Sequence, residues 1–579
     1  MFFTIKNILI ATFVTVLSLC LLVNTIRCNA GSFYVERDVL WNTIADAANG
    51  NDIIVKNGAT LTIDVKNAVC NSLRLGDNNN PNKGNGFLTF KRKSVLAVKG
   101  LVTIGDNLMQ GTIDMSSGGT LTCEGFIENH VAAFISGQGT VIIPRGKKLP
   151  KNFAFFQSEE HRKLSRLANI DFEKKDYKSA GESYQKLLTE LPPIAFYNYR
   201  LGICYFNSIS EKEKAIPYLK KAAEGFRDIS DSVPAEIFYY LAKTYHRDNQ
   251  FEKAIEQYEN HKISVEKDIQ VSKKLKQNVL SMINREIQLC NYGNELKNKP
   301  VNVLIDNLGE EVNTIYPDYS PILRSDGTLV FTSRREGSTG GKKDKEGNFF
   351  EDIYISHVEK GTSSSKFSSA STEKISNRIN SPSHDAAIQF AGDKLFFYRN
   401  GSVCVSTLNL KNGKWGKPEK LKRNENPSAF EPSAALSPDE QTLYLVSDRN
   451  GGHGGLDIYR YEKLPNGIWG KPKNLGAVIN TPYDEDGVFI GKDGKTLYFS
   501  SKGHKSMGGY DIFKSTYNSS TETWSKPENL GYPVNTGGDD IYFMMAPNGE
   551  RAYYASDKNG GFGDMDIYRI TFIEKEDTN

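Results

Sequence analysis

Hydrophobic and polar residues alternate with a period of two through much of the chain after residue 300. The clearest runs are Leu443-Tyr-Leu445, Leu497-Tyr-Phe499 and Ala552-Tyr-Tyr554. Each run follows a turn that contains Asp or Asn, and a glycine-rich loop with Asp-Ile-Tyr or Asp-Ile-Phe comes after it. Such alternation, bounded by turn residues, is typical of β-strands joined in hairpins. The repeated order predicts one small β-sheet used several times.

Five copies of this unit predict a five-bladed β-propeller, in which each blade is a four-stranded sheet. The outer strand of a blade is expected to begin near Trp415, Trp469 or Trp524 and to end at Asn474-Leu-Gly476 or Asn529-Leu-Gly531. Six blades are the alternative if residues 361–375 hide further strands, although Ser and Thr there favour a loop. The turns that mark the five copies are Ser325-Asp-Gly327, Gly392-Asp-Lys394, Ser437-Pro-Asp439, Lys492-Asp-Gly494 and Pro547-Asn-Gly549.

The last copy lacks its outer strand, because it stops at Ile567-Tyr-Arg-Ile-Thr-Phe572. The missing Asn-Leu-Gly ending occurs instead at the front of the region, in the segment from Val301 to Gly309. We therefore expect the first strand to complete the last blade, which would leave no open sheet edge.

Residues 31–145 show short alternating strands separated by Gly and Asn corners, which predicts a β-rich, β-solenoid-like domain. A compact β-sandwich is the alternative. The expected strands are Asp52–Val55, Ala59–Asp64, Ser94–Val98, Leu101–Ile104, Thr120–Cys123 and Gly139–Ile143.

Helical periodicity replaces alternation over residues 153–292, and the segment resembles tetratricopeptide repeats. In this family a small residue in the first helix is followed by Ala and then by an aromatic residue in the second. The resemblance implies core-packing roles for the matching residues and a cap from a charged helix over residues 264–290, since an array end exposes apolar surface. The matching residues are Ala168, Ala180, Tyr184, Pro192, Leu201, Gly202, Tyr205, Ala215, Leu219, Ala222, Leu241, Ala242, Tyr245, Ala254 and Tyr258.

Residues 1–30 read as a signal peptide, with Lys6 before the apolar run Ile8–Val23 and cleavage expected after Ala30. An uncleaved anchor is the alternative, but the run is shorter than the roughly 20 residues that span a bilayer. Lipidation at Cys20 or Cys28 is disfavoured because Leu19 and Arg27 stand where a small residue is expected. The 579 residues thus divide into 1–30, 31–145, 153–292 and 301–573.

Composition and charge exclude some functions. Of the 72 basic residues, Lys6 and Arg27 fall in the signal peptide, so 70 basic residues remain against 69 acidic residues. This near balance gives no excess of positive charge that would favour nucleic-acid binding. No second long apolar segment occurs, so no transmembrane segment is expected in the mature chain. Five cysteines remain after cleavage, with no metal-binding spacing, although Cys70 and Cys123 could pair.

Residues 301–573 also resemble the PD40 (WD40-like, TolB-type) repeat family. The resemblance rests on three repeated motifs, which are the Asp-Gly turn, the Leu-Tyr-Phe-Ser strand and the sequence Gly-Gly…Asp-Ile-Tyr. The order of signal, tetratricopeptide repeats and propeller resembles envelope proteins of Bacteroidetes-type bacteria, some of them associated with type IX secretion and gliding. Such relatives usually also carry an OmpA-like domain, which is not expected here. The resemblance implies a periplasmic or outer-membrane-associated protein whose partners are envelope or secretion-machinery proteins.

The glycine loops 448–457 and 557–566 are the sharpest candidates for a site. Their carboxylates suit calcium, but the ligand spacing of an EF-hand is absent. We expect instead that Asp457, Asp511 and Asp566 bond the amides of the loops and hold the blade register.

No catalytic motif is present, so no enzyme activity, catalytic residue, cofactor or metal ligand is assigned. His384, His453 and His504 sit on propeller loops and could meet at one face. Lysine-rich segments 342–345 and 417–423 are expected to be solvated loops. We expect functional residues at the positions where the copies differ, which are loop 335–351 and the degenerate blade at Arg399–Val405.

The composition and repeats thus favour a non-enzymatic envelope scaffold that binds proteins through its helical and propeller surfaces. The alternative is a carbohydrate-binding or hydrolytic propeller protein, with glycans as partners and residues 31–145 as an adhesin-like module.

Overall fold

The computed structural model describes residues 26–142 with gaps, the longest at 43–50 and 76–85, and then 159–190, 195–225, 233–267, 272–344, 347–357, 372–423 and 429–573. Residues 1–25 of the expected signal peptide and most of segment 361–375 lie outside this range. The chain contacts define two compact units, the first Met1–Asn207 with Lys214–Ile237 and the second Ser208–Glu213 with Phe238–Asn579. None of the described helices is both long and apolar enough to cross a membrane.

The N-terminal part of the first unit consists of three β-sheets whose strands pair in parallel, except that β1 pairs antiparallel with β2. The chain visits the sheets in turn, so β4, β5 and β6 are followed by β7, β8 and β9 in the same order. The first sheet contains β1 (Ile26–Asn29), β2 (Ser32–Val35), β4 (Asp52–Val55), β7 (Leu73–Leu75), β10 (Val102–Ile104) and β13 (Ile127–Asn129). The second contains β3 (Val39–Leu40), β5 (Ala59–Ile63), β8 (Gly86–Phe90), β11 (Gly111–Met115) and β14 (Ala133–Gly137). The third contains β6 (Ala68–Cys70), β9 (Val95–Val98), β12 (Thr120–Cys123) and β15 (Thr140–Ile142).

Aliphatic side chains stack along the inside of these sheets. Leu61 lies in register with Leu88, and Leu88 in turn with Ile113, and all three are fully buried. Every second residue of β5 is buried, which is the alternation that predicted the strand. The β-rich prediction is confirmed, and parallel pairing between successive coils does not fit the alternative of an antiparallel sandwich. The side chain of Cys123 lies outside the described residues, so its pairing with Cys70 stays a prediction.

Four helices complete the first unit, and adjacent helices pack against each other. Of the residues that the sequence assigned to core packing, Tyr205 is only partly buried and Pro192 lies outside the described residues. The others are buried, among them Ala168, Ala180 and Tyr184. At Gly202 an added Cβ would lie 2.5 Å from Leu219 Cδ2, so only glycine allows this approach of α5 to α6. The helices are α3 (Glu159–Glu173), α4 (Tyr177–Glu190), α5 (Ala195–Phe206) and α6 (Ala215–Gly225), with the 3₁₀ turn η1 (Lys212–Lys214) before α6.

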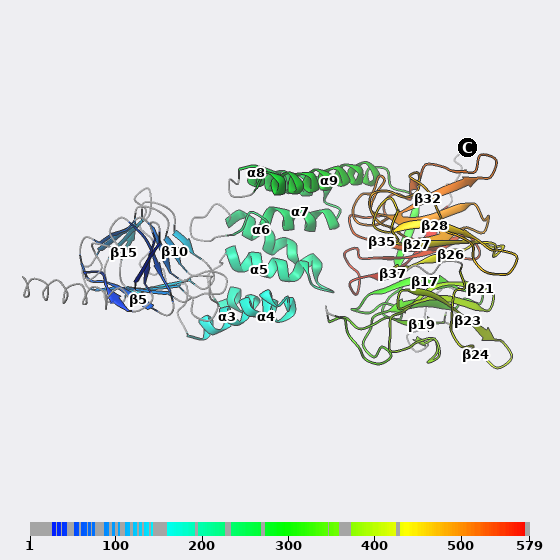
Figure 1. The fold of residues 1–579 in the computed structure, drawn as a ribbon, viewed down its shortest axis with the longest axis horizontal. Coiled ribbons are helices and arrows are strands. Elements are labelled where there is room, and N and C mark those ends of the chain that lie inside the picture. The colour runs from blue at the N-terminus through cyan, green and yellow to red at the C-terminus, as the bar shows by residue number, and fades with distance from the viewer. Residues whose placement is uncertain are drawn as a thin grey trace, which may run out of the picture. The chain divides into compact units, whose positions relative to one another are not determined.

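The second unit begins with α7 (Ile237–Arg247), α8 (Phe251–Lys267) and α9 (Lys273–Lys297), and α8 packs along α9 (Figure 1). Ala242, Ala254 and Tyr258 are buried as expected. The expectation of one helix over 264–290 is wrong in its bounds. α8 continues to Lys267, and α9 starts after Ser272, whose side chain accepts a bond from the Leu275 amide and caps the new helix.

The rest of the second unit is a five-bladed β-propeller, as predicted (Figure 1). Blade 1 contains β17 (Asp318–Leu323), β18 (Leu329–Ser333), β19 (Asp352–Ser356) and β20 (Glu373–Lys374). Blade 2 contains β21 (Asp385–Ala391), β22 (Lys394–Arg399), β23 (Ser402–Asn409), β24 (Lys414–Trp415) and β25 (Glu419–Lys420). Blade 3 contains β26 (Ala434–Leu436), β27 (Thr442–Ser447), β28 (Asp457–Glu462) and β29 (Lys473–Asn474). Blade 4 contains β30 (Glu485–Ile490), β31 (Thr496–Ser501), β32 (Asp511–Asn518), β33 (Thr523–Trp524) and β34 (Glu528–Asn529). Blade 5 contains β35 (Asp540–Met545), β36 (Arg551–Ser556), β37 (Asp566–Phe572) and β16 (Val303–Asn307).

The ring closes with a strand from the front of the propeller sequence. β16 pairs antiparallel with β37, with Ile305 opposite Ile570, so the expected completion of the last blade is confirmed. The first strands of the blades, β17, β21, β26, β30 and β35, contact one another in a closed cycle. The hydrophobic core therefore lies between neighbouring blades rather than in one central cluster.

The outer strands are shorter than expected. In blades 2 and 4 the strand divides into two pieces, with Pro418 and Pro527 between them. Proline lacks the amide hydrogen that a continuous ladder needs, so the first piece ends at the Trp and the second begins directly after the proline.

Candidate functional site

The aspartate of each Asp-Ile-Tyr motif fastens the glycine loop that precedes it. In blade 3 the buried carboxylate of Asp457 accepts bonds from the amides of His453 and Gly454, and from Asn474 Nδ2 at 3.0 Å. Asp511 and Asp566 make the matching bonds in blades 4 and 5. The interpretation of these residues as structural anchors agrees with this geometry.

A second asparagine, six residues after the first, clamps the same strand. Asn480 Oδ1 accepts from the Ile458 amide at 2.8 Å, and its Nδ2 donates to the Ile458 carbonyl at 3.0 Å. The same clamp recurs in other blades, at Asn313, Asn380 and Asn535. Sequence reasoning missed it, although the spacing Asn474/Asn480 and Asn529/Asn535 was there to find.

A carboxylate at or just before the first strand of each blade forms a further repeated contact. In blades 1 and 2 an arginine donates to it, as Arg335 does to Asp318 at 2.7 Å. In blades 4 and 5 the described donors to Glu485 and Asp540 are hydroxyl and amide groups. Burial raises the pKa of Glu485 to about 7 and that of Asp540 to about 6.

In blade 3 the corresponding acid is Glu431, which takes two bonds from Arg423 at 2.7 and 2.8 Å and one from Arg449 at 3.0 Å. Arg423 is almost fully buried, so the expectation that 417–423 is a solvated loop is wrong at this residue. Its partner lies eight residues away in the sequence, and a local charge pattern does not reveal such a pair.

In blade 2, which is the degenerate blade, other residues take the positions of the serine and aspartate that face each other in blade 3. Arg399 occupies the position of Ser447, opposite Ser402 rather than an aspartate, and its guanidinium reaches Asp385 instead. In loop 335–351, the Lys343 ammonium lies 4.3 Å from the centre of the Phe349 ring. At the positions where the copies differ, one contact within the protein therefore takes the place of another.

Of the three propeller histidines expected to meet at one face, two line the same pocket. His453 and His504 line one pocket of about 650 Å³, which we call the blade 3–4 pocket. His384 lies elsewhere, with its ring stacked on Phe350 at 3.8 Å between centres and bonded to Glu351. The pocket is lined by Arg285 of α9, by His453 and His504, by the segment Ala477, Val478, Asn480, Thr481, Pro482 and Tyr483, and by Trp524, Lys526 and Pro527.

Burial favours the neutral form of the His504 ring. Burial lowers its pKa, and Nε2 lies 2.8 Å from the Ile479 carbonyl oxygen. A carbonyl only accepts, so Nε2 carries the hydrogen and Nδ1 is the acceptor. This bond ties the His504 ring to the start of loop 477–483.

The end of α7 and the turn after it dock on the glycine loops of blades 4 and 5. His246 Nε2 donates to the Met507 carbonyl at 2.8 Å inside the protein, and Arg247 pairs with Asp557. The Gly537 amide donates to Asn249 Oδ1 at 2.8 Å. An added Cβ on Gly537 would lie 1.9 Å from the His246 carbonyl oxygen, so this loop needs glycine to receive the helix.

Behind this contact, Glu286 of α9 bonds His246 and Lys243. Burial opposes its ionisation, but these two partners outweigh burial and lower the pKa of Glu286 to about 2. The sequence could not reveal this docking, since its residues lie more than 250 positions apart.

The calcium alternative loses support at the glycine loops. Asp457 and Asp566 point their oxygens at amide hydrogens, and Asp557 faces Arg247 and the Asp539 amide. A cation would have to displace these donors. Among the described residues, no three His, Cys, Asp or Glu side chains gather as a metal site.

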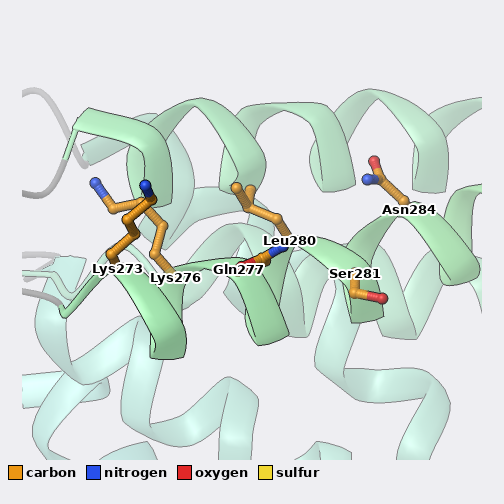
Figure 2. A pocket seen from close by; sticks show the side chains of 6 residues that line it. All are labelled: Lys273, Lys276, Gln277, Leu280, Ser281 and Asn284. Carbon is orange, nitrogen blue, oxygen red and sulfur yellow. The ribbon is translucent and has the colours of Figure 1, made fainter.

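A second pocket, of about 490 Å³, lies along one side of α9 (Figure 2). Lys273 and Lys276 stand near the start of the helix, and Leu280 brings an apolar side chain between polar neighbours. Its six described lining residues, which Figure 2 labels, are Lys273, Lys276, Gln277, Leu280, Ser281 and Asn284.

Comparison with known proteins yields no family model and no curated protein that matches this chain. Weak likenesses to solved structures exist. A carbohydrate-active enzyme of family AA12 from Trichoderma reesei is 9% identical, with a TM-score of 0.27 over 47% of this chain and 96% of that one. A functionally unknown protein from Desulfotomaculum acetoxidans is 11% identical, with a TM-score of 0.25 over 43% and 74%. These likenesses are too weak to carry an argument about function.

Proposed function

We propose that the chain is a non-enzymatic scaffold of the bacterial cell envelope that binds protein partners through its helices and its propeller. The observation that carries the proposal is the docking of α7 and α9 on blades 4 and 5. Buried bonds such as His246–Met507 fix α7 to α9 on the propeller within the second unit. Both architectures build wide, rigid surfaces, and rigid surfaces bind partners with little loss of conformational entropy.

Exposed apolar side chains on the helices support a role in binding. Leu275 and Met282 of α9 are 54% and 59% exposed, and Leu167 of α3 is 51% exposed. Large apolar residues left in solvent along a helix are typical contact points for a partner.

The location in the envelope is also a proposal. It rests on the apolar segment Ile8–Val23 with Lys6 before it and on the resemblance of the repeats to envelope proteins. We expect export across the inner membrane and a periplasmic or outer-membrane-associated protein, which cell fractionation with an antibody to the chain tests.

A pull-down from envelope extracts tests the scaffold. Since α7 and α9 pack on the propeller, deleting the helices would uncover its surface, so substitutions are preferable. Leu275→Glu with Met282→Glu should reduce capture of at least one partner by about tenfold, whereas Asn291→Glu, at an exposed position of the same helix, should not.

Failure of the intact chain to enrich any protein would contradict the scaffold. Binding on a glycan array, or glycosidase activity of the purified chain, would instead support the carbohydrate alternative.

A further inference from the structure

The blade 3–4 pocket leaves apolar surface open to solvent. Val478 and Tyr483 are 49% and 40% exposed, and both line it. Pro482 and Pro527 add rigid apolar walls, and Trp524 is half-buried at the same place. Burying such surface against a ligand would be favourable by about 25 cal/mol per Å².

The pocket also carries positive charge without a matching acid. Arg285 and Lys526 line it, and no carboxylate is among its described lining residues. In the part of the chain that the structure describes, neither the Lys526 ammonium nor the His453 ring has a hydrogen-bond or ion-pair partner. Two cationic or protonatable groups are therefore available to an anion.

The walls are already fixed. The Arg285 guanidinium lies 3.3 Å from the centre of the Tyr483 ring and donates to the Lys502 carbonyl. Trp524 packs against Tyr517, at 5.1 Å between ring centres. A site that is formed before binding loses less entropy when it takes a ligand.

The polar groups of the pocket favour a peptide over a sugar. Hydroxyl-rich ligands need side-chain amides and carboxylates with free bonding capacity. Here the Asn480 amide is used by Ile458 and Asn474, and the Thr481 hydroxyl by Glu485. What remains free is charge and apolar surface, which match a carboxylate next to an apolar side chain.

We propose that the blade 3–4 pocket binds an acidic peptide segment of a partner protein, with carboxylates at Lys526 and His453 and an apolar side chain against Val478 and Trp524. This inference rests on the proposed scaffold function and names the partner chemistry at one site.

Fluorescence polarisation with the full chain tests it. The probe is a fluorescein-labelled pool of hexapeptides in which Asp or Glu flanks a central pair of Leu, Val or Phe residues. A matched pool carries Asn and Gln at the acidic positions. The acidic pool should bind more tightly, and added salt should weaken its binding.

Lys526→Glu should weaken binding of the acidic pool by about tenfold or more, and Val478→Ser should weaken it to a smaller degree. The matched control is Lys495→Glu, which makes the same charge change on an exposed turn of blade 4 outside the pocket. Unchanged melting temperatures would show that all three variants fold.

Equal binding of the two pools, or undiminished binding to the Lys526→Glu variant, would overturn the proposal. So would binding of an oligogalacturonate without binding of the acidic pool, which would make the ligand an acidic sugar. If partners from the envelope extract are released by the α9 variants but not by Lys526→Glu, the scaffold stands and the pocket proposal fails.

Discussion

Glu485 shows how one buried side chain makes the stability of a blade depend on pH. Thr481 and Ser501 donate to its carboxylate, and no arginine is among the described donors to it, unlike the acids of blades 1 to 3. Its pKa, raised by burial to about 7, exceeds the ordinary value of 4.5. The folded state therefore holds a proton that the unfolded chain releases above pH 5.

The propeller should consequently become more stable as pH falls from 8 to 5. A raised acid pKa contributes stability that is complete below the unfolded value and is lost as pH rises through the folded value. Asp540 and Asp486, with pKa values of about 6, act in the same direction. His504, whose pKa is lowered, opposes them below about pH 6.5.

Tryptophan fluorescence during heating measures this, because three of the four tryptophans lie in the propeller. Each pKa unit corresponds to about 1.4 kcal/mol, so Glu485 alone should account for about 3 kcal/mol of the change. Glu485→Gln should flatten the dependence of the melting temperature on pH, whereas Glu462→Gln, at an exposed side chain of blade 3, should leave it unchanged. A steeper dependence in Glu485→Gln would contradict the assignment.

At this scale the sequence revealed some contacts and not others. The repeated Asp-Ile-Tyr motif identified Asp457 and its counterparts, because the loop amides that they bind lie only a few residues away. It brought His453 and His504 together, but His384 does not line their pocket and bonds Glu351 of the neighbouring blade instead. Arg285 enters the blade 3–4 pocket from a helix about 200 residues earlier, and no local pattern encodes such a contact.

Among the elements, β16 closes the ring although it is only five residues long. Ile305 is partly buried against the core between blades 4 and 5, while Leu304 on the opposite face is 57% exposed. Without β16, the edge of β37 would present unpaired amides and carbonyls to other molecules.

Ile305→Glu should therefore lower the melting temperature of the propeller by several degrees and promote aggregation, since a charge would enter an apolar core at a cost of about 2 kcal/mol or more. Leu304→Glu is the matched control on the same strand and should change the melting temperature little. Calorimetry with light scattering measures both. Equal effects of the two substitutions would show that β16 does not close the ring in solution.

The sequence predicted whether a segment forms a helix or a strand better than it predicted the first and last residues of that element. The sequence located β5, β27 and β31 correctly. β5 alternates between buried and partly buried residues over its whole length, and β27 and β31 each follow a turn that recurs in other blades. Sequence reasoning missed β8 and β11 of the solenoid-like part and joined outer strands that Pro418 and Pro527 interrupt. Short parallel strands gain their stability from neighbouring coils, so little of their pattern is local.

On the scale of the whole molecule, the helices α7 to α9 belong with the propeller rather than with α3 to α6. Buried contacts hold them there, including His246 with Met507 and Arg247 with Asp557. Their covalent link to the propeller is the exposed segment Asn298–Pro300.

Cutting this link should not release the propeller. With a protease site inserted in residues 298–300, the two fragments should remain together in size-exclusion chromatography after cleavage. The same cut in a chain with His246→Ala and Arg247→Glu should let them separate, because the buried bond and the ion pair are both lost. Separation of the unsubstituted fragments would refute the docking.

The closure of the ring has a further consequence, for the order of events during synthesis. Asn307 of β16 and Asp566 of β37, which bond to each other, are 259 residues apart. At roughly 5–20 residues per second, β16 leaves the ribosome about 13–50 s before its partner strand exists. During that interval β16 has no partner strand, so the ring cannot close before β37 has been made.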